Sequence, residues 1–210
     1  MVDEPADHLL RELAADGVWT QRQLAARLAR WALEAPARYL TQTVVLLRPT
    51  GWSHRRVRVT VVRPSEGGDH RLRGMGVRAQ QIRPEELEHG VGLAELRWQY
   101  GIPAERYRAQ DVLGRDHRRA IARGGVGLGP AVADGVYEMP DGVVLCEYDH
   151  GRYTSRRILA KLGAFRSATR LDGKRIVGTV WGAPTERRAA RLRSLGAGEV
   201  LVVPPERWLG

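Results

Sequence analysis

The sequence has little cysteine and little lysine. Cys146 is the only cysteine, and Lys161 and Lys174 are the only lysines among 210 residues. A single cysteine excludes an internal disulfide and a cysteine-based zinc site. No apolar run approaches the roughly 18 residues that a membrane-spanning helix needs, and no signal-peptide core is found. We therefore expect a cytoplasmic protein that does not insert into a membrane.

The charge of the chain is strongly positive. The sequence holds 34 lysines and arginines against 24 acids, which gives a net charge of +10 and a pI near 10.7. Its hydrophobic content of 43% is enough for a folded core, so the charge belongs to a globular protein and not to a basic tail. This surplus favours nucleic acid as the partner. The preference for arginine suits phosphate recognition, but a GC-rich coding sequence produces the same bias.

The first 50 residues carry three helical patterns. Leu9, Leu10 and Leu13 have helical spacing, and a capping box at Thr20 to Gln23 precedes a second apolar stripe. The predicted helices are Glu4 to Ala15, a helix that begins after Thr20 and includes Trp31, and Pro36 to Leu47.

The next stretch alternates basic and apolar residues. Arg55 to Arg63 is therefore predicted to be a strand with one positive face, followed by a turn at Ser65 to Asp69 and a returning strand that carries Arg71, Arg73 and Arg78. Three helices followed by a basic hairpin resemble a winged helix. The resemblance implies a DNA-binding domain at residues 1–80, whose third helix reads bases and whose hairpin contacts phosphates. The candidate DNA-binding residues are Arg38, Thr41, Gln42, Arg55, Arg56, Arg58 and Arg63. The alternative is a small helical domain capped by a charged ribbon.

A second domain is predicted at residues 84–210. Pro84 and two following acids suit the start of a helix that runs to about Tyr100. Glu95 lies in the middle of this helix, where it is either a solvated helix charge or a further catalytic carboxylate.

A β-hairpin between Val132 and Cys146 is the clearest pattern in the second domain. Two apolar runs flank Pro140-Asp141-Gly142, which has the composition of a tight turn. Asp134 begins the hairpin and Glu147 and Asp149 follow its end, so antiparallel pairing brings the three carboxylates to one end of the sheet. They are the candidate ligands of a hard metal ion.

The remainder of the chain alternates helices and buried strands. Helices are predicted from Thr154 to Arg166 and from Thr185 to Leu195, and strands from Arg175 to Trp181 and from Glu199 to Val203. Two apolar strands joined by an amphipathic helix indicate parallel pairing. The fold class is therefore α/β, or α+β overall, with a mixed sheet.

The order helix, hairpin, helix, strand, helix, strand resembles the PD-(D/E)XK nuclease superfamily, the restriction-endonuclease-like fold. The resemblance implies that Asp134 and Glu147 bind Mg²⁺ or Mn²⁺ for phosphodiester hydrolysis. Asp149 occupies the position where the family has its lysine. Lys161, on the following helix, is the candidate replacement, because some members of the superfamily carry their lysine there.

The segment Glu147-Tyr148-Asp149-His150-Gly151, the pair Lys161-Leu162 with Phe165, and the later run from Trp181 to Leu192 resemble the replication-relaxation family. That family looks like a winged helix joined to a nuclease-like domain. The resemblance implies a role in the replication or relaxation of plasmid, phage or mobile-element DNA.

Three functional hypotheses follow. The first is a protein that binds double-stranded DNA and whose nuclease-like domain does not cleave. The second is an active Mg²⁺- or Mn²⁺-dependent DNA endonuclease that uses Asp134, Glu147, Asp149 and Lys161 or Glu95. The third is an accessory module that binds replication proteins. A homodimer is an expected partner arrangement in each case, because winged-helix proteins often dimerise.

Overall fold

The computed structural model describes residues 4–49, 56–109 and 133–209. The chain divides into two compact units, residues 1–105 with 204–210, and residues 106–203. Both units combine helices and strands, in agreement with the predicted α/β class. None of the described helices has the length and hydrophobicity that a membrane crossing requires.

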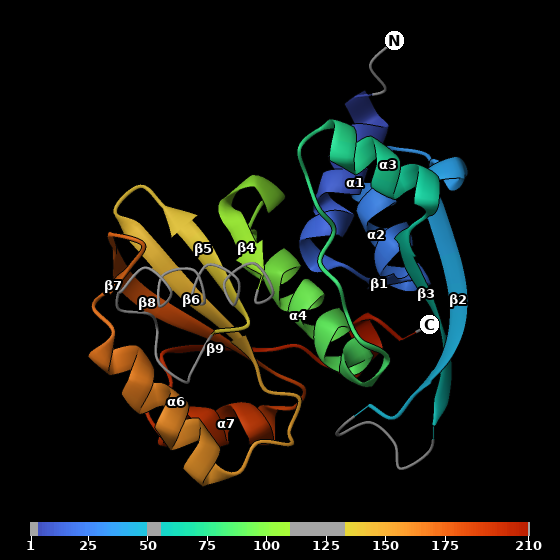
Figure 1. Ribbon diagram of the computed structural model, residues 1–210. Coiled ribbons are helices and arrows are strands. Elements are labelled where there is room, and N and C mark those ends of the chain that lie inside the picture. The colour runs from blue at the N-terminus through green and yellow to red at the C-terminus, as the bar shows by residue number, and fades with distance from the viewer. Residues whose placement is uncertain (1–3, 50–55, 110–132, 210) are drawn as a thin grey trace. The chain divides into compact units, whose positions relative to one another are not determined.

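The first unit packs helices on a small antiparallel sheet in the order β1-β3-β2 (Figure 1). Its helices and strands are α1 (Glu4–Asp16), β1 (Trp19–Thr20), α2 (Gln21–Trp31), β2 (Leu40–Leu47), β3 (Val57–Pro64), α3 (Glu66–Gly74) and α4 (Leu87–Tyr100). Short 3₁₀ helices lie at Ala37–Tyr39, Pro84–Glu86, Ala104–Arg106 and Pro205–Arg207.

The first two predicted helices are confirmed. Leu9 and Leu13 of α1 are fully buried, and they pack with Trp19 and with Leu24 of α2. The capping box is present, since the Gln23 amide donates to Thr20 Oγ1 at 3.1 Å and the Thr20 amide donates to Gln23 Oε1 at 3.0 Å.

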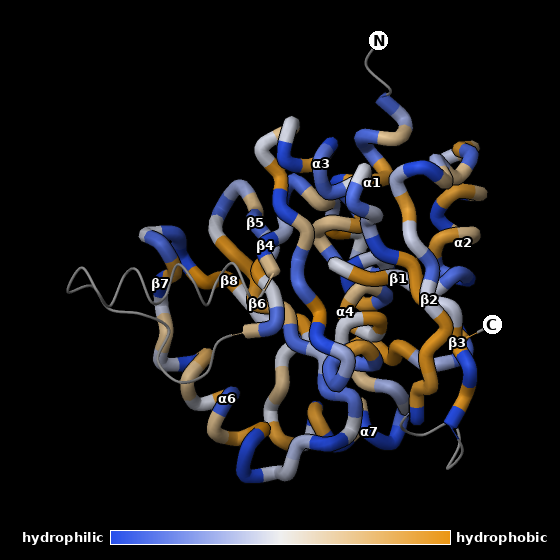
Figure 2. The backbone as a smooth tube through the Cα atoms, turned by 45° about the vertical axis from the view of Figure 1, so that its right-hand side comes forward, coloured by the Kyte–Doolittle hydropathy of each residue, from blue (hydrophilic) through white to orange (hydrophobic). Residues whose placement is uncertain are grey.

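The third predicted helix is wrong, because residues 40–47 form the strand β2. All eight residues pair antiparallel with β3. Val45 and Leu47 alternate along the strand and pack beside Val59 and Val61 of β3. The β-branched residues of this segment suit a pleated ribbon, and β3 pairs with one backbone edge of β2. Figure 2 shows hydrophobic and hydrophilic residues along β2 and β3.

The returning strand predicted near residues 71–78 is also wrong, because residues 71–74 belong to the helix α3. The Ser65 side chain caps this helix by accepting a hydrogen bond from the Gly68 amide at 3.2 Å. A Cβ atom at Gly68 would collide with the Tyr39 carbonyl oxygen. Glycine at this position therefore permits the close approach of α3 to the backbone of Tyr39, and it does not mark a turn. The described residues therefore do not reproduce the predicted order of three helices followed by a hairpin.

The helix α4 is confirmed in its bounds but lies in the first unit. Leu87 and Val91 pack with Trp208 and Leu209 at the end of the chain. The boundary between the units is accordingly at residues 105 and 106, and not at residues 80–84 as predicted.

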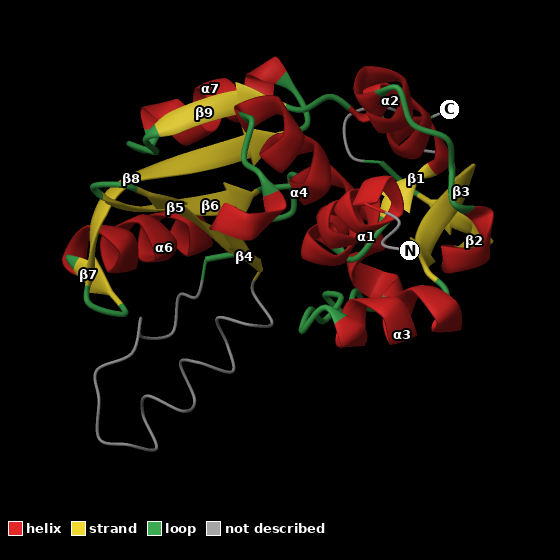
Figure 3. Ribbon diagram, turned by 90° about the horizontal axis from the view of Figure 1, so that it is seen from above, coloured by secondary structure: helices red, strands yellow, loops and turns green. Residues whose placement is uncertain are grey.

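The second unit is built on one mixed sheet, with strand order β4-β5-β6-β8-β7 and β9 paired to β8 (Figure 3). Its helices and strands are β4 (Tyr107–Ala109), β5 (Gly135–Met139), β6 (Gly142–Tyr148), α6 (Ser155–Ser167), β7 (Arg170–Leu171), β8 (Lys174–Ala183), α7 (Glu186–Ser194) and β9 (Glu199–Val202). The predicted hairpin is confirmed as β5 and β6, which are antiparallel and joined through Pro140 and Asp141. The predicted parallel pairing is confirmed for β8 with β9, and β6 also pairs parallel with β8.

The helices α6 and α7 share one hydrophobic core with the sheet. Ile158, Leu162 and Phe165 of α6 pack in the same cluster as Leu145 of β6 and Trp181 of β8, and Ala189 and Leu192 of α7 complete this cluster. Both helices consequently cover the same face of the sheet (Figure 1). Thr154 caps the N-terminus of α6 and Thr185 caps that of α7. These are the residues at which the sequence predicted the two helices to begin.

A candidate carboxylate and lysine site

Antiparallel pairing of β5 with β6 brings Asp134 and Glu147 together. Gly135 is opposite Cys146 in the ladder. Asp134, which precedes Gly135, and Glu147, which follows Cys146, are therefore neighbours. The Tyr148 amide donates to Asp134 Oδ2 at 2.8 Å, which fixes the aspartate against the end of β6. Both carboxylates are buried, with exposed fractions of 2% for Asp134 and 0% for Glu147.

Lys161 reaches these carboxylates from α6. It lies on the buried face of that helix, between Ile158 and Phe165. Its Nζ atom donates a hydrogen bond to Glu147 Oε1 and lies 4.0 Å from Asp134 Oδ1. The predicted replacement lysine and the first two predicted acids therefore meet in one cluster, in which two carboxylates face one ammonium group.

Tyr153 packs over this cluster. The Lys161 Nζ atom lies 5.4 Å from the centre of the Tyr153 ring, and the Arg157 guanidinium lies 4.1 Å from it. Burial raises the pKa of the Tyr153 hydroxyl well above its ordinary value, and the negative charges of Asp134 and Glu147 raise it further. A neutral phenol thus limits the access of water to the carboxylates.

Asp149 does not join the cluster, contrary to the prediction. Its carboxylate pairs with Arg188 of α7, with 2.6 Å between Arg188 Nη2 and Asp149 Oδ2, and it also accepts from the Gly151 amide at 2.9 Å. Arg188 donates in addition to the Tyr153 carbonyl at 2.5 Å. Among the residues that the structure describes, no group of three histidine, cysteine, aspartate or glutamate side chains is arranged to hold a metal ion. In the structure Asp149 is thus paired with Arg188 and is not grouped with Asp134 and Glu147.

Glu95 belongs to the first unit, where its contacts are those of a structural residue. It accepts a hydrogen bond from Gln23 Nε2 at 3.1 Å and lies 4.0 Å from the Arg27 guanidinium. Arg27 is buried between the rings of Trp19 and Trp98, at 4.6 and 4.7 Å from their centres. Burial lowers the pKa of Arg27 to about 10, although the carboxylates of Asp16 and Glu95 act against this shift. Glu95 thus compensates a buried charge.

The candidate DNA-binding residues lie on the ribbon formed by β2 and β3. Thr41 and Gln42 are exposed at the start of β2, and Arg38 is exposed in the short 3₁₀ helix that precedes this strand. Arg58 is exposed at the start of β3, and Arg56 is exposed directly before it. Since β2 is a strand, these positions do not form the base-reading helix that the sequence suggested.

Two of the predicted phosphate contacts differ from the rest. Arg63 is half-buried and donates to the Ile82 carbonyl at 3.0 Å, so its guanidinium has a structural partner. Arg55 lies outside the described residues.

The sequence interpretation missed the roles of Arg188 and Tyr153. An arginine on an amphipathic helix is ordinarily solvated, yet Arg188 is half-buried against Asp149. No local pattern distinguishes it from Arg187, because only the position of α7 beside the end of β6 separates them.

Comparisons of this chain with protein-family models, with curated proteins and with solved structures found no match.

Proposed function

We propose that this chain is a DNA-binding protein of a plasmid, phage or mobile element that acts in DNA replication or relaxation or in its control. The observation that carries the proposal is the meeting of Asp134, Glu147 and Lys161 at the end of the hairpin. This is the arrangement that the resemblance to nuclease-like domains of the replication-relaxation family implies. The net charge of +10 supports a polyanionic partner for such a domain.

The ribbon of β2 and β3 supplies the DNA contact in this proposal. A two-stranded antiparallel ribbon fits the major groove of duplex DNA, and some DNA-binding proteins read bases in this way. Arg56 and Arg58 are exposed near one end of the ribbon and would neutralise phosphates. Gln42 is exposed near the other end, on the same face as Arg58, and offers its side chain to base edges, whereas Thr41 lies on the opposite face of β2.

Duplex binding is tested with Arg56→Gln, Arg58→Gln. The matched control is Arg11→Gln, Arg187→Gln, which removes the same charge at two exposed positions that do not belong to the ribbon. Loss of two phosphate contacts should weaken binding at every sequence and reduce the slope of log K against log salt by about 2. Equal loss of binding in the control would contradict the ribbon as the binding element.

The position of Lys161 favours a second candidate function, metal-dependent cleavage of DNA. The sequence departs from the nuclease pattern at Asp149, where a lysine is expected. The Lys161 Nζ atom supplies that missing cation from α6, directly beside Glu147. An ammonium group there can orient a water molecule and stabilise negative charge during attack on a phosphodiester.

The donor set fits a hard divalent cation, since Mg²⁺ commonly binds through one or two carboxylates and keeps several waters. Asp134 and Glu147 are the residues that would hold it. A bound Mg²⁺ supplies neutralisation of the charge that develops on the phosphorane. Lys161 pairs with Glu147 in the structure and Tyr153 packs nearby, so cleavage also requires the protein to rearrange these two side chains.

Cleavage is tested by nicking of supercoiled plasmid in the presence of Mn²⁺. We expect the Glu147→Gln and Lys161→Met variants to lose activity by about 100-fold or more if the site is catalytic. Glu138→Gln is the matched control, because Glu138 is an exposed acid of the same hairpin that pairs with Lys174 at 2.5 Å. Retention of nicking in Glu147→Gln would contradict the site, and absence of nicking by the wild type would leave DNA binding without cleavage.

A further inference from the structure

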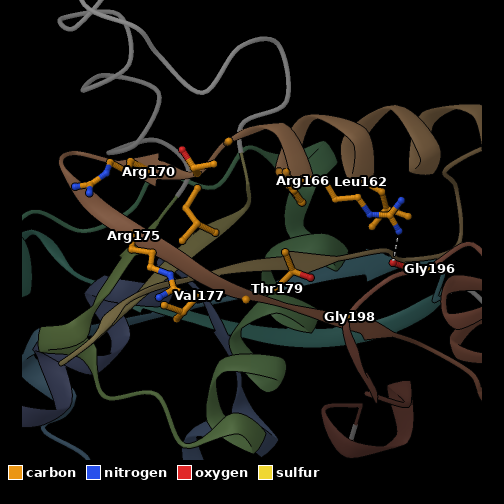
Figure 4. Close-up of a pocket in the computed structure, with 13 residues that line it drawn as sticks. Leu162, Arg166, Arg170, Arg175, Val177, Thr179, Gly196 and Gly198 are labelled. Atoms are coloured by element: carbon orange, nitrogen blue, oxygen red, sulfur yellow. Dashed lines mark hydrogen bonds between the residues drawn. The ribbon is translucent and has the colours of Figure 1, made fainter.

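A cavity of about 630 Å³ lies in the second unit, apart from the carboxylates (Figure 4). Its walls are the C-terminal half of α6, the strand β7, the first half of β8 and the turn at residues 196–198 that follows α7. A cavity of this size is in the range of roughly 300–1,000 Å³ that is usual for sites that bind small molecules.

The gap in the sheet beside β8 forms this cavity. The strand β7 pairs with β8 only at Lys174 and Arg175, and β9 pairs with it only from Val180 onward. Residues 176–179 therefore have β6 on one side and neither β7 nor β9 on the other. Gly198 closes the far wall, where a Cβ atom would come within 2.7 Å of Thr179 Oγ1 and 2.8 Å of the Thr179 carbonyl oxygen.

The lining of the cavity is cationic. Arg166, Arg170 and Arg175 come from three different elements, and the described lining residues include no carboxylate. Figure 4 shows Arg166 beside Gly196 at one end, Arg170 and Arg175 toward the other, and Thr179 between them. Arg166 is held there by a hydrogen bond from its Nη2 atom to the Gly196 carbonyl at 2.9 Å. Cationic groups at both ends suit a ligand that carries more than one anionic group.

The floor of the cavity is aliphatic. It includes Leu162 of α6 and Ile176 and Val177 of β8. A ligand that matches this cavity therefore combines separated negative charges with an apolar body. A segment of nucleic acid has this composition, because phosphates alternate with sugars and flat bases.

We propose that this cavity binds a short segment of single-stranded nucleic acid, with phosphates at its two arginine ends and a base or sugar on the aliphatic floor between them. A duplex is too wide and too stiff to enter a pocket of this volume, whereas a single strand can fold into it.

The cavity and the carboxylate site lie at opposite ends of the same pair of strands. Glu147 is opposite Trp181 near the C-terminal ends of the parallel strands β6 and β8, whereas Ile176 is opposite Val143 near their starts. The proposal therefore goes beyond the proposed function and depends neither on a metal ion nor on cleavage.

The test is fluorescence anisotropy of a labelled oligothymidylate of about 12 nucleotides with the full chain, in EDTA and at constant salt. Arg170→Gln, Arg175→Gln removes two exposed cations of the cavity, and Arg166→Gln alters its other end. Arg156→Gln, Arg187→Gln is the matched control, because these residues are exposed on α6 and α7 of the same unit and do not line the cavity. Circular dichroism melting curves verify that each variant is folded.

We expect the cavity double variant to weaken binding about tenfold and the control to weaken it less than about twofold. The Arg56→Gln, Arg58→Gln background separates this effect from the ribbon, since the cavity variants should retain their effect there even if the ribbon does not bind duplex DNA. Equal weakening by cavity and control variants, or no binding of the oligothymidylate by the wild type, would overturn the proposal.

Competitors identify the ligand. Unlabelled oligothymidylate should displace the probe, and dTMP at the same nucleotide concentration should not, because a single phosphate cannot occupy both ends. Effective competition by dTMP would overturn the strand as the source of the phosphates. Competition by polyglutamate as strong as that by the oligonucleotide would show a general anion site and would also overturn the proposal.

Discussion

Lys161 and Glu147 are 14 residues apart in the chain and form a buried ion pair between α6 and β6. Asp134 lies 4.0 Å from the same ammonium group, which therefore serves two carboxylates. Neither carboxylate is exposed by more than 3% of its side chain. The stability of the second unit consequently depends on this one cation.

Lys161→Met should be strongly destabilising, because it removes the ammonium group that pairs with the buried carboxylate of Glu147 and lies near that of Asp134. We expect a loss of about 3–5 kcal/mol in the free energy of unfolding, measured by urea denaturation near neutral pH. The double variant Lys161→Met, Glu147→Gln should recover about 1–3 kcal/mol relative to the sum of the single effects. Lys174→Met is the control, since its exposed pair with Glu138 is expected to contribute at most about 1 kcal/mol.

The hairpin and its acids could be predicted because their signals are local. Pro140 and Asp141 favour a tight turn, and the register of a hairpin then places Asp134 beside Glu147. The helical position of Lys161 follows from the apolar spacing of α6, so its approach to the strand ends was also accessible to sequence reasoning.

The course of Asp149 could not be predicted from the same pattern. It shares a strand face with Glu147 by spacing, but β6 ends at Tyr148 and the following turn directs Asp149 to Arg188. Arg188 lies 39 residues further along the chain, on a helix whose position depends on the packing of the whole sheet. Such a contact leaves no trace in local periodicity.

The segment at residues 40–47 illustrates a second limit. Leu40, Val44 and Leu47 have the spacing of a helix face, whereas Val45 and Leu47 have that of a strand face. The two patterns are equally visible in the sequence, and the pairing with β3 decides between them. That pairing is a tertiary contact, and it replaced the expected recognition helix with a ribbon.

A second prediction concerns Arg97, which holds the first unit together from inside α4. Its Nε atom lies 2.6 Å from Asp16 Oδ1, its Nη2 atom lies 2.7 Å from Glu12 Oε2, and its Nη1 atom donates to the Ile102 carbonyl at 2.7 Å. Burial by itself lowers the pKa of the Arg97 guanidinium. The carboxylates of Asp16 and Glu12 together have the larger effect and raise this pKa above its ordinary value.

Arg97→Met should therefore cost about 3–5 kcal/mol in the free energy of unfolding, because both carboxylates lose a buried partner. Glu186→Gln is the comparison, since the Glu186 pair with Arg193 at 2.6 Å is exposed and should contribute at most about 1 kcal/mol. Similar urea midpoints for the two variants would contradict the structural role assigned to Arg97.

A third prediction uses two glycines of the second unit. A Cβ atom at Gly142 would collide with the Arg175 carbonyl oxygen and lie 2.7 Å from Val177 Cγ1, because β8 approaches the start of β6 closely. Gly163 lies inside α6, and a Cβ atom there would meet nothing within 4 Å.

Gly142→Ala should destabilise the protein by about 2 kcal/mol or more, since the neighbouring atom is backbone and cannot move aside alone. Gly163→Ala should stabilise it by about 0.5–1 kcal/mol, because alanine restricts the unfolded chain and favours the helix. The melting temperatures of the two variants should therefore shift in opposite directions relative to the wild type. Shifts of the same sign would contradict the close approach of β8 to Gly142.

The last prediction concerns the loss of stability at alkaline pH that Tyr153 causes. Burial and the neighbouring carboxylates raise the pKa of its hydroxyl above the ordinary value of about 10 that it has in the unfolded chain. Above about pH 10 the folded protein then keeps a proton that the unfolded chain releases, so the contribution of this group is fully present below that pH and is lost as the pH rises further. In Tyr153→Phe the free energy of unfolding should fall less steeply between about pH 9.5 and 11.5 than in the wild type. Absorbance near 295 nm provides an independent measurement, since the difference between wild type and variant should show no phenolate until the protein unfolds. A normal titration of this difference near pH 10 would mean that water and hydroxide reach the Tyr153 hydroxyl freely, and that it does not shield Asp134 and Glu147.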